Sequence, residues 1–134
     1  KKLNKKHVLL CIGGDQRDEV SLFGKTQFVS IKKNKTKEFS FDFSKEIETI
    51  PQDYICGNSH KNALIFSNIL LEKDWDHPII KHISINSAAA LLCLDKVQSL
   101  QEGYELSMNS FKTNAVIKSI NRYKKASTQF LNSL

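Results

Sequence analysis

The sequence predicts an α/β fold in which a mixed sheet is flanked by helices. Three observations support this: a short apolar run closed by glycines near the start, two further strand-like segments before residue 50, and helical periodicity from residue 57 onward. Strands followed by strand–helix units favour a layered α/β structure. We expect residues 1–134 to form a single unit, with 1–50 strand-rich and containing a β-hairpin, and 57–125 mostly helical.

The expected strands follow from local composition. Val8–Ile12 is wholly apolar and favours a buried parallel strand over an edge strand. Gln27–Ile31 is a second strand, and Glu38–Phe43 is a third, because its phenylalanines alternate with polar residues. The polar link Lys32–Lys37 predicts a hairpin between these two, with the turn type left open. Ile47–Cys56, which contains a proline, is expected to be a connecting loop.

Two helices are expected in the middle of the chain. The first begins at Asn58 and ends near Lys73, and its apolar face comprises Ala63, Ile65, Phe66, Ile69 and Leu70. His82–Ile85 is a candidate for a short strand, and Asn86 is expected to begin an alanine-rich helix.

Two more helices are expected at the end of the chain. Ser99 and Glu102 stand at capping-box spacing before an apolar face made by Leu100, Tyr104, Met108 and Phe111. Thr113 is expected to cap the last helix, and its inward residues are Val116, Ile120 and Tyr123. From Ala126 the tail is expected to fray.

The composition narrows the class of protein. The chain of 134 residues is 40% apolar and 25% charged, which indicates a globular protein rather than a disordered chain or a disulfide scaffold. No apolar run reaches the roughly 18 residues of a membrane span, and no signal segment follows Lys1, so we expect a soluble, cytoplasmic protein without membrane contact. The cysteines Cys11, Cys56 and Cys93 form no CxxC pair, and reduced thiols are expected.

The net charge of +6 raises the question of a polyanionic partner. Most of the cations are lysines, without the interleaved arginine and aromatic side chains of a base-reading surface. A solvated basic surface is therefore the favoured interpretation, and a nucleic-acid-binding module is the alternative.

Acidic residues follow the first strand. Gly13 and Gly14 form neither GxGxxG nor a P-loop, so a strand-ending turn that needs positive φ is favoured over a phosphate cradle. Asp18 and Glu19 lie just beyond the carboxyl end of this strand, where open α/β sheets bind ligands. Magnesium takes one or two carboxylates plus water and phosphate oxygens, so the pair is chemically sufficient. The residues alone leave both a metal site and a solvated turn open.

Other polar residues carry weaker signals. The four histidines, His7, His60, His77 and His82, lack metal-ligand spacing. The group Asp74, Asp76 and His77 is interpreted as a helix-ending loop. Ser21 and Ser59 have no evident His–Asp partners for nucleophilic catalysis. Asn86 either positions substrate or caps its helix, and capping is favoured.

Four segments, in order, resemble anthranilate phosphoribosyltransferases. Asp18–Thr26, DEVSLFGKT, resembles the family's D-E-hydrophobic-S-L-x-G-x-T, and the residues from Ile12 to Glu19 are similar to H-G-x-D-G-L-D-E. Asn62-Ala63 resembles an N-A-x-x-hydrophobic helix. Asn86–Leu91 is similar to N-A-A-A-A-L, and Leu100–Leu106 to L-x-E-G-x-E-L. The resemblance covers nearly the whole chain.

This resemblance implies the C-terminal portion of a phosphoribosyltransferase/nucleoside-phosphorylase-type α/β domain. The family transfers phosphoribosyl from phosphoribosyl pyrophosphate to anthranilate in tryptophan biosynthesis. By resemblance, Asp18 and Glu19 coordinate Mg²⁺ on the pyrophosphate, with Glu19 contacting both of two metals. The family's G-T-G-G-D phosphate loop, its serine metal ligand and its N-terminal helical region, which carries the anthranilate pocket and the homodimer contacts, have no counterpart in this sequence. The chain alone is therefore expected to be inactive.

Some positions depart from the family pattern. Ile12 replaces a histidine, Gln16 and Arg17 replace a glycine and a leucine, and Asn114 replaces a glycine near the last helix. Arg17 is expected to face solvent rather than phosphate. The alternative function is a non-catalytic basic module of the same fold that binds nucleic acid, and a pyrimidine nucleoside phosphorylase is disfavoured because its chemistry has no evident need of the Asp-Glu pair.

Overall fold

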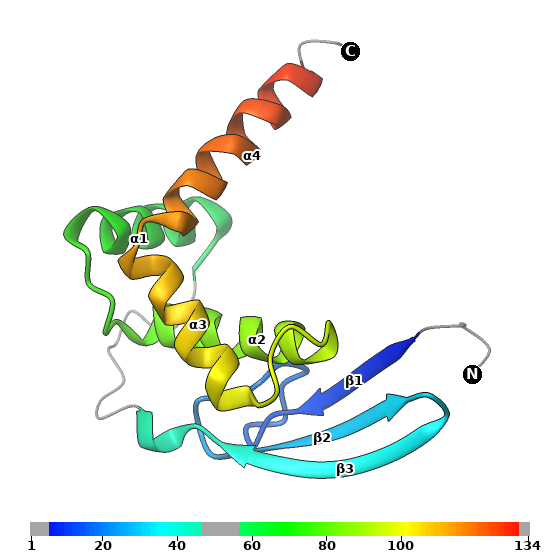
Figure 1. Ribbon diagram of the computed structural model, residues 1–134. Coiled ribbons are helices and arrows are strands. Elements are labelled where there is room, and N and C mark those ends of the chain that lie inside the picture. The colour runs from blue at the N-terminus through cyan, green and yellow to red at the C-terminus, as the bar shows by residue number, and fades with distance from the viewer. Residues whose placement is uncertain (1–5, 47–56, 132–134) are drawn as a thin grey trace.

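The computed structural model describes residues 6–46 and 57–131 of the chain, and the side chains up to Gln129. Figure 1 shows the helices gathered on one side of a small sheet, with the last helix projecting away from the others. The elements are β1 (His7–Ile12), β2 (Lys25–Lys32), β3 (Lys35–Asp42), the 3-10 helix η1 (Ser44–Glu46), α1 (Ser59–Glu72), α2 (Pro78–Cys93), α3 (Leu100–Lys112) and α4 (Ala115–Leu131). The expected connecting loop at Ile47–Cys56 lies outside the described residues.

The sheet is antiparallel throughout the described residues, with the order β1-β2-β3. The fold is therefore α/β as expected, but the prediction of a mixed sheet is wrong for this part of the chain. The prediction that Val8–Ile12 forms a buried parallel strand is also wrong, because within the described residues β1 pairs only with the antiparallel β2. Leu10 and Ile12 of β1 are 55% and 54% exposed, since one face of the strand is left uncovered.

The predicted hairpin joins β2 and β3. Lys32 pairs with Lys35, so only Lys33 and Asn34 form the turn. Both have positive φ, 47° and 64°, as a two-residue hairpin turn of the primed type requires. The link is shorter than predicted because the residues from Lys35 to Lys37 pair within β3. Phe28 of β2 stacks on Phe39 of β3 with ring centroids 4.9 Å apart.

The main hydrophobic core lies between the inner face of the sheet and helices α2 and α3. It joins the sheet's Phe28 to the loop residues Val20 and Leu22 and to residues of both helices; its other members are Phe43, Ile85, Ala88, Leu100 and Tyr104. Phe43 and Tyr104 have ring centroids 5.7 Å apart. Burial raises the pKa of Tyr104 to about 12, and nearby Glu46 and Asp76 add to the rise, so this tyrosine is neutral at physiological pH. The loop after β1 is thus anchored in the same core as the helices.

Helix α1 begins and ends where its sequence signals predict, although Ala63 of the predicted apolar face is exposed. Asn58 Oδ1 accepts a hydrogen bond from Lys61 N at 2.9 Å, and Gly57 N donates to Asn62 Oδ1 at 2.8 Å. Lys73 ends the helix in the left-handed conformation, with φ 56°. Its buried face packs into a second cluster with α2 and α3, made by Ile69, Ile80 and Phe111. The asparagine of the Asn62-Ala63 motif therefore serves the start of a helix.

Helix α2 overturns two predictions. Neither the strand at His82–Ile85 nor a helix start at Asn86 exists, because one continuous helix spans both segments. It begins where Pro78 occupies the first turn and His77 Nδ1 accepts a hydrogen bond from Ile79 N at 3.1 Å. These start signals and burial of the isoleucines outweigh the β-propensity of the segment. Asp74, Asp76 and His77 lie in the connection between α1 and α2, as expected.

The capping box of α3 is confirmed. Ser99 Oγ accepts a hydrogen bond from Glu102 N at 3.1 Å, and the Glu102 carboxylate accepts one from Gln98 N at 2.7 Å. Along the predicted apolar face, Leu100, Tyr104 and Phe111 are buried.

The predictions for the last helix are partly wrong. Thr113 ends α3 rather than starting α4, and Asn114 takes positive φ, 59°, between the two helices. Tyr123 is 75% exposed rather than inward, because α4 projects beyond the helix it packs against. The helix continues to Leu131, so the fraying expected from Ala126 does not occur.

Among the described residues, the helices include none whose length and apolar character would suffice for a membrane span.

The contact between α2 and α3 leads to a stability prediction. A Cβ on Gly103 would lie 2.9 Å from both Cα and Cβ of Ala88, which is closer than packed atoms approach. We expect Gly103→Ala to lower the free energy of unfolding by about 1–3 kcal/mol through overpacking. Urea unfolding measures the change, with Glu105→Ala on the exposed side of α3 as the control. A stabilised Gly103→Ala, as helix propensity alone would give, contradicts the close contact.

Candidate functional site

The loop that joins β1 to β2 carries the acidic residues. It turns back on itself through two backbone hydrogen bonds of 2.9 Å, from Gly13 N to Arg17 O and from Gln16 N to Gly13 O. The turn interpretation is confirmed, but the positive φ belongs to Gln16, at 63°, and to neither glycine. Gly13 is required by space instead, since a Cβ there would lie 2.9 Å from Ser21 Cβ and 3.0 Å from Glu19 O.

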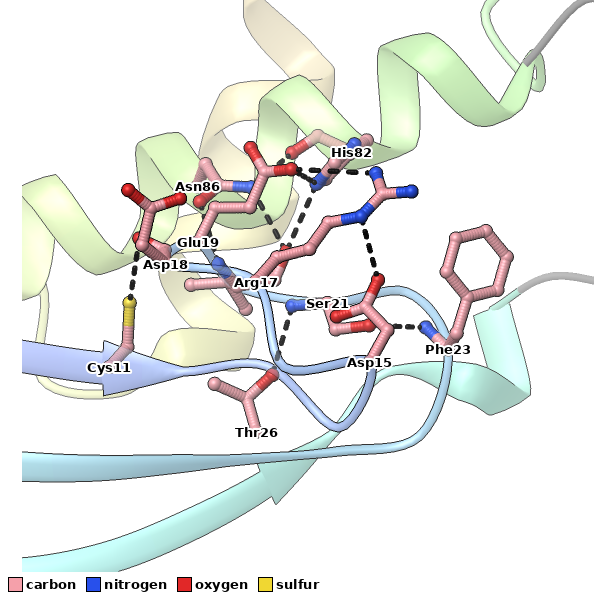
Figure 2. Close-up of polar contacts among 11 residues, drawn as sticks. Cys11, Asp15, Arg17, Asp18, Glu19, Ser21, Phe23, Thr26, His82 and Asn86 are labelled. Atoms are coloured by element: carbon pink, nitrogen blue, oxygen red, sulfur yellow. Dashed lines mark hydrogen bonds and ion pairs between the residues drawn. The ribbon is translucent and has the colours of Figure 1, made fainter. Parts of the chain in front are cut away.

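The rest of the DEVSLFGKT motif holds the loop in place. Val20 and Leu22 are each 1% exposed and anchor the loop in the core. Between them, Ser21 N donates a hydrogen bond to Thr26 Oγ1 at 2.9 Å, and Phe23 N donates to Ser21 Oγ at 2.8 Å (Figure 2). Gly24 has φ 95°, a conformation that other residues rarely adopt. The Ser, Leu, Gly and Thr positions of the motif therefore have structural roles.

The side-chain amide of Asn86 binds both the N–H and the C=O group of Val20. Its Oδ1 accepts a hydrogen bond from Val20 N at 2.9 Å, and its Nδ2 donates to Val20 O at 3.1 Å. Nδ2 also donates to His82 O, one turn earlier in α2, at 3.1 Å. The prediction that Asn86 caps a helix is wrong, because it lies within α2 and its amide is used to hold the loop. We call this arrangement the Asn86–Val20 clamp.

His82 joins the same arrangement. Its Nε2 lies 3.1 Å from Val20 O, and since a carbonyl only accepts, the ring donates there. The same nitrogen lies 3.7 Å from Glu19 Oε1. His82 and Asn86 are four residues apart in one helix, so they share a face. The sequence did not predict this pairing, because it placed His82 in a candidate strand and Asn86 at the start of a helix.

The clamp presents the two predicted metal ligands outward. Asp18 is exposed, and within the described residues its carboxylate has no hydrogen bond or ion pair. The Glu19 side chain is 42% exposed, and its Oε1 lies 3.8 Å from Arg17 Nη1. Figure 2 shows Asp18 and Glu19 next to each other, with Glu19 reaching toward His82 on α2. One carboxylate is thus free, and the other is held only by long contacts.

Arg17 lies among acids rather than being merely solvated. Its Nε is 3.3 Å from Asp15 Oδ2, so the guanidinium contacts both Asp15 and Glu19 while remaining half exposed. The second carboxylate oxygen of Asp15 is buried and has no hydrogen-bond partner in the described part of the chain. Three acids against one arginine leave the loop with a local excess of negative charge.

This negative charge affects the pKa of the Cys11 thiol. It lies at the end of β1, and its Sγ is 3.9 Å from Asp18 O. Burial raises the pKa of the Cys11 thiol, and the charges of Asp18 and Glu19 raise it further. Cys11 and Cys93 are free thiols, as expected.

Asp18 and Glu19 offer carboxylate oxygens, which are ligands for hard divalent cations. In the part of the chain that the structure describes, no cluster of three or more His, Cys, Asp or Glu side chains is arranged to hold a metal ion. Structural zinc, which needs a closed set of four ligands, therefore does not fit here. Mg²⁺ keeps several waters and takes one or two carboxylates, so Asp18 and Glu19 have the chemistry of its protein ligands.

Sequence comparison supplies the context for this loop. Over 100 residues the chain is 39% identical to an anthranilate phosphoribosyltransferase of Saccharolobus islandicus, which covers 73% of the chain and 28% of the relative. The chain is homologous to part of anthranilate phosphoribosyltransferase. The enzymes of that name from Thermomicrobium roseum and Dictyoglomus turgidum are 30% and 34% identical, over 91% and 78% of the chain.

These anthranilate phosphoribosyltransferases are much longer than the homologous segment. The chain spans about a third of the length of the curated relatives that it matches, from 28% to 36% in the three examples. No protein-family model matches the chain.

The clamp predicts a stability change at Asn86. Asn86→Ala leaves the N–H and C=O groups of Val20 without their amide partner, and we expect a loss of about 1–3 kcal/mol in the free energy of unfolding. Asn68→Ala, on the exposed side of α1, removes an asparagine without such bonds and is the control. Thermal and urea unfolding measure both variants. Equal stability of the two would show that the clamp contributes nothing.

A second prediction uses the Cys11 thiol as a probe. Because its pKa is raised, alkylation of Cys11 by iodoacetamide at pH 8 should be slower than that of an unperturbed cysteine. Asp18→Asn removes one of the charges that raise the pKa and should increase the rate on the order of twofold. Mass spectrometry resolves Cys11 from the other cysteines. An unchanged rate in Asp18→Asn, beside the control Glu38→Gln on β3, would contradict the electrostatic contact.

Proposed function

We propose that this chain supplies the metal-binding acid pair of an anthranilate phosphoribosyltransferase that uses Mg²⁺. The observation that carries the proposal is that Asp18 and Glu19 stand exposed on a loop held to α2 by the Asn86–Val20 clamp, in a chain homologous to part of that enzyme. The reaction, transfer of phosphoribosyl from phosphoribosyl pyrophosphate to anthranilate in tryptophan biosynthesis, then belongs to the complete enzyme. We expect the isolated chain to be inactive.

The charge of the loop supports binding of phosphates through a cation. The loop carries three carboxylates and one guanidinium, so its net charge is negative. This charge would repel pyrophosphate if no cation lay between them. Bound Mg²⁺ would neutralise the departing pyrophosphate while positive charge develops at the ribose C1. The carboxylate of Asp18, which has no partner among the described residues, is available as a ligand, and Glu19 lies near His82 and Arg17. Glu19 is expected to contact both metals if two are present.

Other residues of the chain position this pair rather than react. The clamp restrains Val20, which directly follows Glu19, so the direction of the acids depends on α2. Anthranilate carries an amine that is already nucleophilic, so its orientation matters more than a strong general base. No residue of this chain is assigned a catalytic proton transfer, and a substrate contact by Asn86 is not part of the proposal, because its amide is already bonded.

The complete enzyme is expected to resemble its relatives in assembly. The family's phosphate loop, anthranilate pocket and homodimer contacts belong to the part of the enzyme that lies outside the segment homologous to this chain. A biosynthetic enzyme of this kind is expected in the cytoplasm.

Metal binding can be tested without activity. We expect Mn²⁺, used as a paramagnetic substitute for Mg²⁺ together with pyrophosphate, to broaden the NMR signals of Asp18, Glu19 and Val20 selectively. Asp18→Asn and Glu19→Gln should each weaken binding at least about tenfold, as loss of one charged ligand predicts. The control Glu38→Gln keeps the same charge change on β3, away from the loop. Broadening that is equal in all variants would refute the metal site.

Activity is tested in the reconstituted enzyme. When this chain is combined with the rest of the enzyme, Asp18→Ala and Glu19→Ala should each lower kcat/KM by on the order of 100-fold while unfolding is unchanged. Wild-type rates in both variants at limiting Mg²⁺ would overturn the assignment.

A further inference from the structure

A cavity of about 400 Å³ lies between the connection from α2 to α3 and the end of the sheet where the hairpin joins β2 to β3. Its volume is within the range of small-molecule sites, roughly 300–1,000 Å³. The cavity includes the first residue of β1, whereas the acidic loop follows the last, so it is separate from the candidate metal site. Its polar lining includes His7, Ser30, Lys32, Lys37, Asp95 and Gln98.

His7 is the buried polar side chain of this cavity. It is only 10% exposed, and its Nε2 lies 2.9 Å from the hydroxyl oxygen of Ser30. The other ring nitrogen, Nδ1, is buried and has no hydrogen-bond partner within the described residues. Asp95 Oδ1 lies 3.7 Å from it, which is too far for a hydrogen bond. Because buried polar atoms are normally hydrogen-bonded, this nitrogen needs an acceptor or donor that the free protein does not place within reach.

The cavity has an excess of positive charge. Lys32 and Lys37 line it from the hairpin, and Asp95 is the one acid among the lining residues. Asp95 is ion-paired with Lys32, and that hydrogen bond, together with the charges of Lys32 and His7, lowers the pKa of the Asp95 carboxyl. Lys37 has no hydrogen bond or ion pair in the described part of the chain. A second anion would therefore be attracted to the cavity.

The rest of the lining is apolar. Phe39 and Phe41 are half-buried on β3, and Val97 and Leu100, each 3% exposed, line the cavity from the helix side. Aromatic and aliphatic walls combined with a few charged groups are typical of a site for a molecule that has an apolar body and one charged group. Inorganic phosphate would use the cations but leave these walls without contact.

We propose that this cavity binds a small carboxylate that carries an apolar ring, and that the Asp95 carboxylate takes the place of the ligand's anion in the free protein. In the complex, the ligand carboxylate contacts Lys32, Lys37 and His7 Nδ1, and the ring packs between the phenylalanines of β3 and the helix side. The Asp95 side chain is 56% exposed, so it is able to turn toward solvent when the ligand enters. The inference does not depend on the proposed function.

The test titrates the full chain of 134 residues with benzoate and follows its NMR signals. We expect saturable shifts that include the His7 imidazole and the Lys37 and Asp95 amides. Benzamide lacks the charge and inorganic phosphate lacks the ring, so each should bind at least about tenfold more weakly. The absence of saturable shifts with benzoate, or equal binding of benzamide or phosphate, refutes the proposal.

Two variants should act in opposite directions. Lys37→Gln removes an unpaired cation and should weaken benzoate binding about tenfold. Asp95→Asn removes the internal competitor and should strengthen binding severalfold. Both side chains are exposed, so the variants should fold, and circular dichroism checks this.

The matched control is Lys25→Gln, which has the same charge change at the other end of β2 and should leave benzoate binding unchanged. Equal effects of Lys37→Gln and Lys25→Gln would show a long-range charge effect and refute the cavity as the site. Weaker binding in Asp95→Asn would refute the role of Asp95 as the competing anion. Metal binding is measured separately, so its failure would leave this result standing.

Discussion

The candidate site depends on one interaction, the pair of hydrogen bonds from Asn86 to the backbone of Val20. A loop with three acids in five residues has little reason to stay close to a helix, since its charges repel one another. Because a single amide satisfies both backbone groups of Val20, the loop is tied to α2 at the residue after the acid pair. His82 Nε2 also donates to the carbonyl oxygen of Val20, so Val20 makes three hydrogen bonds with side chains of α2. Two carboxylates can then remain exposed without disordering the loop.

The same constraint explains why the loop motif is long. The exposed acids need buried neighbours that anchor the loop, and Val20 and Leu22, which follow Glu19, provide them. Thr26 Oγ1 accepts a hydrogen bond from Ser21 N, and Ser21 Oγ accepts one from Phe23 N. The positive φ of Gly24 allows the chain to turn into β2. Most of the motif therefore shapes the loop, while the carboxylates of Asp18 and Glu19 remain at least partly exposed.

The incorrect assignment of β1 is itself informative. Its sequence has apolar residues on both faces, which is typical of a strand covered on both sides. The described structure covers only the inner face, so the local sequence and the observed surroundings disagree at Leu10 and Ile12. Disagreement of this kind marks a functional or interaction surface more often than a defect. At β3, by contrast, phenylalanines alternate with polar residues, which agrees with one face packed on the core and one face exposed to solvent.

The sequence by itself determined the elements whose signals are local: the hairpin, the limits of α1 at Asn58 and Lys73, and the capping box of α3. It also singled out Asp18, Glu19 and Asn86, through chemistry and resemblance. Only the tertiary structure decided that α2 is continuous, that β1 is antiparallel at an edge, and that Asn86 holds Val20, 66 residues earlier. The reason is physical, because caps and turns act within a few residues, whereas strand pairing and the bonds of a buried amide depend on distant parts of the chain.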